Sequence, residues 1–331
     1  MTTLRAGVIG LGAMGRNHAR ILRSLPGVEL IAAVEPDRNA RAGANGVEVL
    51  TDVSELLKLV PDLCVLATPT VTHTSLGLLL AEARIPTLIE KPLAHDESSA
   101  SVLVDAFEHN DVLACVGHIE RFNPALQHLR DRLANEELGE IYQIFTRRQG
   151  PFPARISDVG VIYDLATHDI DLTSWVMGAA YGSVAAKVAY KSGRTVEDLV
   201  SVVAELVDGT VATHLVNWLS PMKERVVVVC GDRGCFVADT LTADLSFYEN
   251  GTQPSKWETL ATFRGVSEGN MTRFAIPKPE PLETELRAFV EAVRGEDSPI
   301  VTLRDGLMTV SVAEALRRSA QCGAMVKVGE Q

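Results

Sequence analysis

The chain has 331 residues, a formal net charge of −12 at pH 7 and a hydrophobic fraction of 46%. This length corresponds to about two domains, and the apolar content is enough for a sizeable core. The acidic balance argues against a broad surface for nucleic acid or for anionic membranes. The sequence shows neither an apolar run near the roughly 18 residues of a membrane span nor a charged leader with a cleavage site, so we expect a cytoplasmic protein.

The cysteines are odd in number and form no CxxC pair. They also show no Cys/His cluster at a spacing typical of metal ligands. We therefore expect reduced, mostly buried thiols and no metal site. The residues concerned are Cys64, Cys115, Cys230, Cys235 and Cys322.

A glycine-rich turn, Gly10-Leu11-Gly12-Ala13-Met14-Gly15, separates an apolar strand at 5–9 from a helix at 16–25. The first glycine allows the tight turn, the second lets a pyrophosphate approach the backbone, and the third lets helix and strand pack closely. The N-terminus of the helix offers N–H groups and a partial positive charge to that anion. The predicted cofactor contacts in this turn are Gly10, Gly12, Ala13, Met14 and Gly15.

An acidic residue ends the second expected strand, at 30–34. Glu35 follows Gly15 by 20 residues, where a carboxylate accepts hydrogen bonds from an adenosine ribose. The same charge repels a 2′-phosphate, so the sequence favours NAD over NADP. Arg38 is the one nearby cation that would suit NADP, and a solvated charge at a strand end is the alternative interpretation of Glu35.

Strands and helices alternate up to about residue 116. After the glycine-rich turn we expect strands at 47–50, 62–67, 87–89 and 112–116, with helices at 37–44, 53–60, 72–83 and 97–109. Repeated βα units predict a doubly wound parallel sheet, an α/β Rossmann domain whose strand C-terminal ends form the ligand crevice. Residues that directly follow strands should line that crevice as further cofactor contacts: Thr68, Pro69, His73, Glu90 and Lys91.

The second part of the chain has a different pattern. Asn123 is a typical N-cap for a helix at 124–138, because Pro124 suits the first helical position. A strand at 140–148, broken by the Gly150–Pro153 stretch, and a helix at 160–176 ending at Gly178 follow. Strands at 184–190, 199–207, 211–218, 225–230 and 235–238 predict a large open antiparallel sheet, and helices are expected at 283–294 and 303–321. We therefore expect an α+β domain over 121–331 after a dinucleotide-binding domain over 1–120.

Asp164, His168 and Asp171 stand at i, i+4 and i+7 of one expected helix, so their side chains share a face. A carboxylate one turn from an imidazole fixes its tautomer and raises its basicity, which suits His168 as a general base. A polar surface stripe is the alternative. A metal site is less favoured, since no further ligands occur at a recognisable spacing.

Lys91 stands at the end of a buried strand, between Glu90 and Pro92. The proline favours an extended backbone at this lysine. A cation there could hydrogen-bond a substrate hydroxyl and stabilise the alkoxide that forms as hydride leaves. The alternative is a surface lysine after a strand.

These motifs, in this order and spacing, resemble the glucose-fructose oxidoreductase / inositol dehydrogenase (Gfo/Idh/MocA) family. The motifs that carry the resemblance, which covers essentially the whole chain, are Gly10–Gly15, Ala67-Thr68-Pro69 with His73, Glu90-Lys91-Pro92, Arg121-Phe122-Asn123-Pro124 and Asp164-x3-His168-x2-Asp171. The resemblance implies NAD(P)-dependent oxidation of a sugar or cyclitol hydroxyl, with Lys91 and His168 as the catalytic pair and Asp164 orienting them. One departure is the stretch 158–163, which replaces a glycine-rich stretch common before the aspartate, so polyol specificity is not inherited directly.

Within the family, the stretches 117–125, 163–171 and 217–221 resemble the branch of UDP-N-acetylglucosamine 3-dehydrogenases. An acidic protein that binds such a nucleotide sugar needs a local cationic patch. The expected members are Arg121, Arg147, Arg148, Arg155, Lys223 and Arg225. The predicted substrate contacts are Lys91, Arg121, Asn123, Arg148, Asp164 and His168.

The favoured hypothesis is therefore NAD-dependent oxidation of a sugar hydroxyl, with C3 of UDP-N-acetylglucosamine as the first candidate. Another polyol, inositol or deoxysugar-ketone oxidoreductase is the alternative among enzymes. A dinucleotide-binding regulator that has lost catalysis is the alternative of another class. By analogy with the family, we expect a homodimer or homotetramer formed through the antiparallel sheet.

Overall fold

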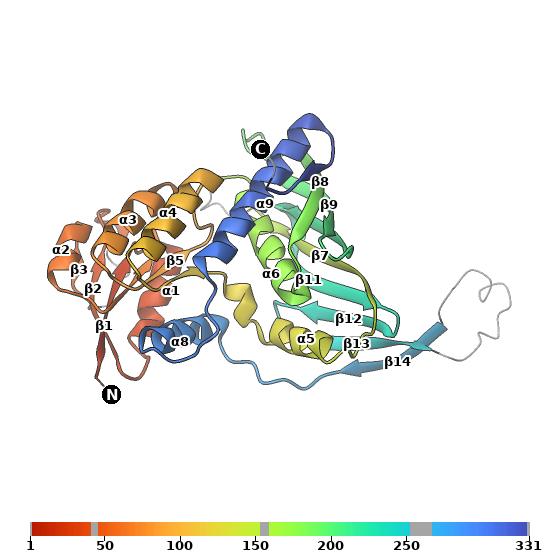
Figure 1. Cartoon of the computed structure of the whole chain (residues 1–331), viewed down its shortest axis with the longest axis horizontal. Coiled ribbons are helices and arrows are strands. Elements are labelled where there is room, and N and C mark those ends of the chain that lie inside the picture. Colours follow the sequence, from red (N-terminus) through yellow and green to blue (C-terminus); the bar gives the residue numbers. More distant parts are fainter. Residues whose placement is uncertain (1, 41–45, 153–158, 252–266, 330–331) are drawn as a thin grey trace. The chain divides into compact units, whose positions relative to one another are not determined.

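The computed structural model describes residues 2–40, 46–152, 159–251 and 267–329, which form two compact units (Figure 1). The first unit holds the chain up to Ile119 together with Glu280–Ser311. The second holds Glu120–Pro279 and the residues from Val312 onward. The expected boundary at residue 120 thus falls where the first unit ends. The segment 280–311, expected in the second domain, packs instead with the first unit.

The first unit contains a six-stranded parallel sheet in the order β3-β2-β1-β4-β5-β6. The order reverses beside β1, as in doubly wound folds, so this unit is the expected Rossmann domain. Its strands are β1 (Leu4–Ile9), β2 (Val28–Val34), β3 (Val49–Leu50), β4 (Leu63–Leu66), β5 (Thr87–Glu90) and β6 (Ala114–Gly117). Its helices are α1 (Ala13–Leu22), α2 (Val53–Lys58), η2 (Thr70–Thr72), α3 (His73–Glu82), α4 (Glu97–His109) and α8 (Pro281–Val293).

Helix α8 joins this unit because its apolar face completes the core. Leu286 and Phe289 are fully buried in the same cluster as Val8 of β1 and Leu88 of β5. Sequence spacing could place a helix here, but not the sheet on which it packs. Only residues 37–40 of the helix expected at 37–44 are described: residue 37 has no regular structure, residues 38–39 form a turn and residue 40 is 3-10 helical. Residues 41–45 lie outside the described ranges.

The second unit contains a nine-stranded sheet in the order β14-β13-β12-β11-β7-β10-β9-β8-β15. Its strands are β7 (Ile141–Pro151), β8 (Tyr181–Ala189), β9 (Leu199–Leu206), β10 (Val211–Asn217), β11 (Leu219–Gly231), β12 (Gly234–Asp239), β13 (Asp244–Gly251), β14 (Ser267–Arg273) and β15 (Val326–Lys327). Its helices include α5 (Pro124–Ala134), the π-helical turn η4 (Ile162–Ala166) and α6 (Thr167–Met177). The short helix η3 (Ile119–Phe122) crosses the boundary of the two units, and α9 (Leu303–Cys322) belongs to the second from Val312.

This sheet is large and mainly antiparallel, as expected, but β7 and β10 are parallel neighbours. The segment between them contains helix α6 and two strands, which is long enough for a crossover. Strand β7 also continues through Gly150 to Pro151, which pairs with Leu219, where the sequence predicted a break. The register of β11 shifts between Leu219 and Glu224, and proline is tolerated at such an irregularity.

Helices cover one face of this sheet (Figure 1). Buried side chains of α5, α6 and α9, among them Leu126, Ile170 and Leu316, share one core with strand residues such as Ile144 and Val227. On this covered face the even-numbered residues of β7 from Ile144 to Gly150 point inward, as the period of a strand requires. The covered face therefore positions polar side chains at its strand ends beside the helices.

The structure also confirms the expected end of helix α6. Gly178 ends α6 in the left-handed conformation, as glycine favours at a helix C-terminus. In the described part of the chain, no helix is both long and apolar enough to cross a membrane.

His214 provides a pH test of this packing. Its ring nitrogens each lie 2.8 Å from a hydroxyl oxygen, of Thr146 and of Tyr181, and burial lowers its pKa to about 4. His214 takes up a proton near pH 6.5 in the unfolded chain but only near pH 4 in the folded chain. The free energy of unfolding is therefore highest above pH 6.5 and falls as the pH drops toward 4. We expect His214 to cost about 2 kcal/mol of unfolding free energy at pH 5 relative to pH 8. Urea denaturation at both pH values should show this loss in the wild type and a smaller one in His214→Asn; equal losses would contradict it.

Candidate active site

The three glycines of the first turn have separate structural roles. Gly10 has φ +93°, and a Cβ there would lie 2.6 Å from the carbonyl oxygen of Ala67. A Cβ on Gly15 would lie 1.9 Å from the carbonyl oxygen of Gly10, so this glycine permits helix–strand contact. A Cβ on Gly12, which caps α1, would meet no protein atom within 4 Å. Gly12 therefore faces open space at the helix N-terminus, which suits a bound pyrophosphate.

Glu35 lies directly after β2 and is 9% exposed. Its carboxylate accepts the amide N–H of Leu11 at 2.8 Å and that of Asp37 at 2.9 Å. These bonds hold the carboxylate against the glycine-rich turn, which is where an adenosine ribose is read in this fold. Arg38 is exposed. The position of Glu35 thus agrees with NAD binding.

Glu90 links three segments of the first unit. One oxygen lies 2.7 Å from Nε2 of His18 on α1, and the other accepts the Lys91 amide N–H at 3.1 Å. Gly117 of β6 leaves room for this carboxylate, since a Cβ there would lie 3.3 Å from it. Burial opposes the charge, but the hydrogen bond from His18 and the charge of Lys91 keep the pKa of Glu90 below its usual value. Glu90 therefore ties the cofactor helix to the backbone of Lys91.

The sequence did not single out His18. It lies on the buried face of α1 with Gly15, Ile21 and Leu22 and is fully buried. A polar side chain on the apolar face of a helix requires a partner, and this was the signal that could have found it.

His73 joins the segments that follow β4 and β5. Its Nε2 lies 3.0 Å from the carbonyl oxygen of Thr68, and its Nδ1 lies 3.1 Å from that of Pro92. It is 1% exposed, and burial lowers its pKa. Pro69 and Thr68 both accept the hydroxyl of Thr72 at 2.7 Å. These residues shape the loops at the carboxyl edge of the sheet, and their cofactor contacts stay predictions.

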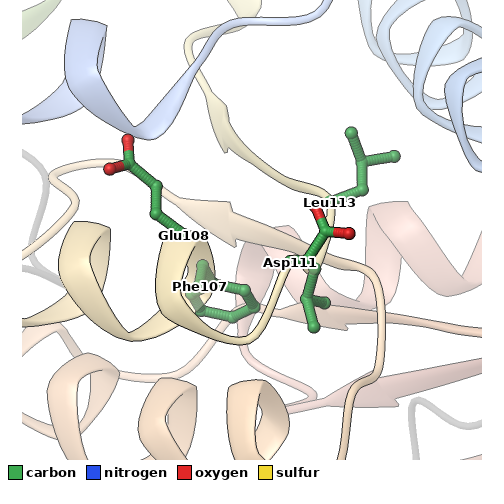
Figure 2. A pocket seen from close by; sticks show the side chains of 5 residues that line it. Phe107, Glu108, Asp111 and Leu113 are labelled. Carbon is green, nitrogen blue, oxygen red and sulfur yellow. The ribbon is translucent and has the colours of Figure 1, made fainter.

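A shallow pocket of about 490 Å³ lies elsewhere on this unit (Figure 2). Its lining runs from the end of α4 to the start of β6, at Phe107, Glu108, Asp111, Val112 and Leu113. That is the amino edge of the parallel strands, whereas ligands of doubly wound sheets bind at the carboxyl edge. This pocket is therefore not the cofactor site.

In the second unit, Asp164 and His168 lie on consecutive helical segments. Asp164 is 8% exposed and belongs to the π-helical turn η4, and half-buried His168 is in the first turn of α6. The sequence predicted one regular α-helix here, which the π turn corrects. Such turns are frequent at functional sites because they shift the helical register.

Asp171 pairs with an arginine that is distant in the sequence. Its carboxylate forms a two-oxygen ion pair with Arg121, with Nη2–Oδ1 at 2.6 Å and Nε–Oδ2 at 3.0 Å. The carboxylate side chain is 1% exposed and the arginine side chain 13%. Arg121 and Asp171 thus connect η3 to α6, and the predicted substrate contact of Arg121 stays a prediction.

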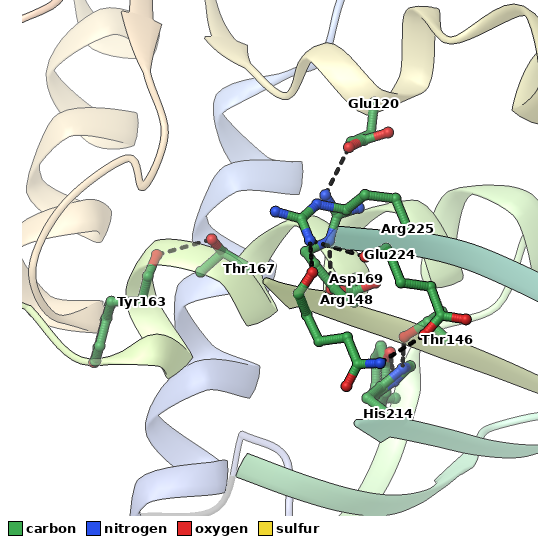
Figure 3. Close-up of polar contacts among 11 residues, drawn as sticks. Glu120, Thr146, Arg148, Tyr163, Thr167, Asp169, His214, Glu224 and Arg225 are labelled. Atoms are coloured by element: carbon green, nitrogen blue, oxygen red, sulfur yellow. Dashed lines mark hydrogen bonds and ion pairs between the residues drawn. The ribbon is translucent and has the colours of Figure 1, made fainter. Parts of the chain in front are cut away.

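Arg148 is buried between two carboxylates (Figure 3). Its Nε lies 2.7 Å from Asp169 and its Nη1 2.7 Å from Glu120. Burial alone would lower the pKa of Arg148, but the two carboxylates outweigh it and raise that pKa, whereas burial raises the pKa of Asp169. The sequence missed Glu120 and Asp169, because their spacing reveals no partner.

Arg225 lies beside Arg148 on the neighbouring strand (Figure 3). Its Nη1 donates to the carbonyl oxygens of Gln149 and Glu224, both at 2.9 Å. Burial, followed by the charge of Arg148, lowers the pKa of Arg225 to about 10. Among the described residues, no carboxylate lies within ion-pair distance of this guanidinium.

Asn123, a predicted substrate contact, and the other predicted members of the cationic patch lie in different surroundings. Asn123 is 5% exposed; its Oδ1 accepts the Ala125 amide at 3.1 Å and its Nδ2 donates to the Thr240 carbonyl at 2.9 Å. Arg147 is half exposed and pairs with Glu224 at 2.6 Å. Lys223 is exposed, and Arg155 lies outside the described residues. Across the described ranges, no group of three or more acidic, histidine or cysteine side chains is arranged to hold a metal ion.

Comparison with known proteins matches two family models. Residues 4–118 match an oxidoreductase family with an NAD-binding Rossmann fold, and residues 126–237 match the GFO/IDH/MocA C-terminal domain. A UDP-N-acetylglucosamine 3-dehydrogenase of Acidithiobacillus ferrooxidans is 29% identical over 299 residues, 88% of this chain and 90% of the relative. The scyllo-inositol 2-dehydrogenase (NAD(+)) of Bacillus subtilis is 26% identical over 98% of this chain and 96% of its own. The crystal structure of GenD2 from gentamicin A biosynthesis, in complex with NAD, has a TM-score of 0.83 and 26% identity, covering 100% of this chain and 97% of the other.

Gly15 and Gly12 of the glycine-rich turn give a matched pair of variants. Gly15→Ala should lower the free energy of unfolding by about 1–3 kcal/mol, because its Cβ meets the Gly10 carbonyl oxygen. Gly12→Ala should lower the free energy of unfolding by less than about 1 kcal/mol, the scale of an N-cap change. It should nevertheless weaken the binding of NAD at least tenfold. Thermal unfolding and calorimetric titration with NAD measure the two effects. Unchanged NAD affinity in a folded Gly12→Ala protein would contradict the assigned pyrophosphate position.

Arg148 and Arg147 give a second pair on one strand. Arg148→Met leaves two buried carboxyls without their cation, so it should destabilise the protein by about 3–5 kcal/mol. Arg147→Met breaks an exposed pair and should cost less than about 1 kcal/mol. Urea unfolding at pH 7 compares them. Similar losses in both would mean that Arg148 is not the centre of a buried network.

Proposed function

Since the chain belongs to the Gfo/Idh/MocA family of oxidoreductases and uses NAD as its cofactor, we propose that it oxidises C3 of UDP-N-acetylglucosamine to the 3-keto sugar. The family relation supports the reaction type, and the relative from Acidithiobacillus ferrooxidans supports the substrate. Relatives that act on inositol are of comparable similarity, so similarity alone does not choose between a charged and a neutral substrate.

Arg225 is the observation that favours the nucleotide sugar. Its guanidinium is half-buried on the covered face and, within the described ranges, donates only to carbonyl oxygens. The carboxylates of Asp169, Glu120 and Asp164 are close enough to act on its charge, but none of them forms an ion pair with it. A buried cation without a direct counter-ion gains most from an anionic ligand. The diphosphate of a UDP-sugar supplies that charge, and a cyclitol does not.

NAD supplies the hydride acceptor when bound. Lys91 holds the C3 hydroxyl oxygen and stabilises the negative charge that develops on it as the C–H bond breaks. His168 takes the hydroxyl proton; its Nδ1 is buried, so Nε2 is the accepting atom. The carboxylate of Asp164, one helical segment earlier, stabilises the imidazolium that results. The C–O bond becomes a carbonyl, with one hydride and one proton removed.

We also propose a homodimer or homotetramer in the cytoplasm. The second face of the large sheet exposes apolar side chains on several strands, including Val203, Val211 and Tyr248 at 42–49% exposure. An open apolar sheet face of this kind suits a second copy of the chain, and sedimentation equilibrium measures the number of copies. All five cysteines are free thiols, as a reducing compartment permits.

A substrate panel tests this function. NADH absorbance should rise with NAD and UDP-N-acetylglucosamine, and much less with NADP, myo-inositol or free hexoses. Lys91→Met and His168→Asn should each lower kcat by at least about 100-fold without changing NAD affinity. Arg225→Met should raise KM for the nucleotide sugar at least tenfold, with Arg147→Met as the matched control.

Three outcomes would contradict the proposal in different ways. Turnover of myo-inositol but not of the nucleotide sugar would favour the polyol alternative. Reduction of a deoxysugar ketone with NADPH would favour the ketone reductase. NAD binding without turnover of any substrate, unchanged in Lys91→Met, would favour a non-catalytic regulator.

A further inference from the structure

One aromatic and cationic cluster of the second unit has no part in the chemistry above. Phe152 follows the last residue of β7, and Trp218 connects β10 to β11. Their rings meet edge to face, with centroids 5.4 Å apart. The Arg194 guanidinium lies 4.5 Å from the Phe152 centroid and 5.1 Å from that of Trp218. We refer to Phe152, Trp218 and Arg194 as the aromatic cluster.

Two buried donors of this cluster lack acceptors. Trp218 is 4% exposed, and its indole N–H has no hydrogen-bond partner within the described residues. The Nη1 of Arg194 is also buried without a partner there, although Nη2 donates to the Val159 carbonyl at 3.2 Å. Native proteins rarely leave buried N–H groups unsatisfied, and those that do usually have a functional reason. The cluster therefore has hydrogen-bonding capacity for an acceptor on a ligand.

One ring of the cluster is accessible. Phe152 is 38% exposed, whereas Trp218 beneath it is almost fully covered. An exposed aromatic ring beside a guanidinium is a stacking platform for a planar π system. A ligand that stacks on Phe152 and carries carbonyl oxygens would lie beside the buried donors of Trp218 and Arg194, and it meets them when a small shift of these side chains exposes the N–H groups.

The cluster lies along the same strand end as the charged groups. Phe152 is four residues beyond Arg148, or about 13 Å along an extended strand. Arg194 is bonded to Val159, and the next residues lead into the π turn that carries Asp164. The neighbouring Glu197 fixes that segment, since its carboxylate accepts the Ile162 amide at 3.1 Å. Sugar, diphosphate and base groups thus have successive partners on one unit.

Resting on the proposed function, we infer that the aromatic cluster is the base-recognition subsite for a uracil nucleotide. The uracil ring stacks on Phe152. Its carbonyl oxygens accept hydrogen bonds from the Trp218 indole and from Arg194. This assigns to the substrate domain a contact with the nucleotide part of the substrate, remote from the reacting carbon.

Binding of UMP tests the subsite without any turnover. On protein saturated with NAD, calorimetry should show UMP binding at least tenfold tighter than ribose 5-phosphate, which has no base. Phe152→Leu should weaken the binding of UMP roughly 5- to 100-fold, the usual effect of losing one base–aromatic stack. It should leave the binding of ribose 5-phosphate unchanged. Trp218→Phe keeps the ring, removes the donor and should weaken UMP about fivefold.

Tyr142→Leu is the matched control. Tyr142 is an aromatic on the same strand, 53% exposed and ten residues from Phe152, so its loss should not affect UMP. Equal UMP affinity in Phe152→Leu and Tyr142→Leu would overturn the subsite even if UDP-N-acetylglucosamine is oxidised. Conversely, a selective loss in Phe152→Leu would support the subsite even if that sugar is not the substrate, in which case only the proposed function fails.

Discussion

A buried carboxylate is the constraint on which the first unit depends. Glu90 cannot remain charged and buried without partners, and it finds them in His18 of the cofactor helix and in the amide of Lys91. Because a buried charge tolerates little displacement, the helix that faces the pyrophosphate and the residue proposed to act on the substrate are fixed to one another. The glycine at position 117 is part of the same arrangement, since it makes room for the carboxylate.

The second unit buries several charged side chains on one face of its sheet. It places several cations and carboxylates on one covered face, and burial there makes every unpaired charge costly. Arg121 and Arg148 satisfy this by pairing with Asp171, Asp169 and Glu120, which fixes η3, β7 and α6 together. Within the described part of the chain, the Arg225 guanidinium donates to carbonyl oxygens and forms no ion pair. Two members of the cationic patch predicted from the sequence, Arg121 and Arg148, thus hold parts of the unit together, and the substrate contacts predicted for them stay predictions.

The sequence predicted those features whose signal is local. Gly10 and Gly15 indicate a tight turn because a side chain at either position would collide with backbone atoms, and the alternation of strands and helices predicts the parallel sheet. The partners of buried charged residues, in contrast, are often distant in the sequence. Spacing placed Asp171 on a face with His168, yet its counter-ion is Arg121, fifty residues earlier in the chain. Strands β13 (Asp244–Gly251) and β14 (Ser267–Arg273) were not predicted because both are mostly polar. β14 is the edge strand of the sheet and β13 is its neighbour. The π turn at Asp164 left no signal either, since its residues also suit an α-helix.

The contrast between local motifs and partners that are distant in the sequence also explains why sequence similarity does not identify the substrate. Relatives that act on a nucleotide sugar and on an inositol are 29% and 26% identical to this chain. Hydride transfer from a hydroxyl carbon places the same demands on cofactor, cation and base in both cases, and those demands fix the motifs that dominate the similarity. The choice of a charged substrate requires few residues: a guanidinium that has no ion pair among the described residues, and a surface that accepts a planar base. Such features occupy few positions and change the overall identity little, so our substrate proposal rests on the surroundings of Arg225 and Trp218 rather than on the family motifs.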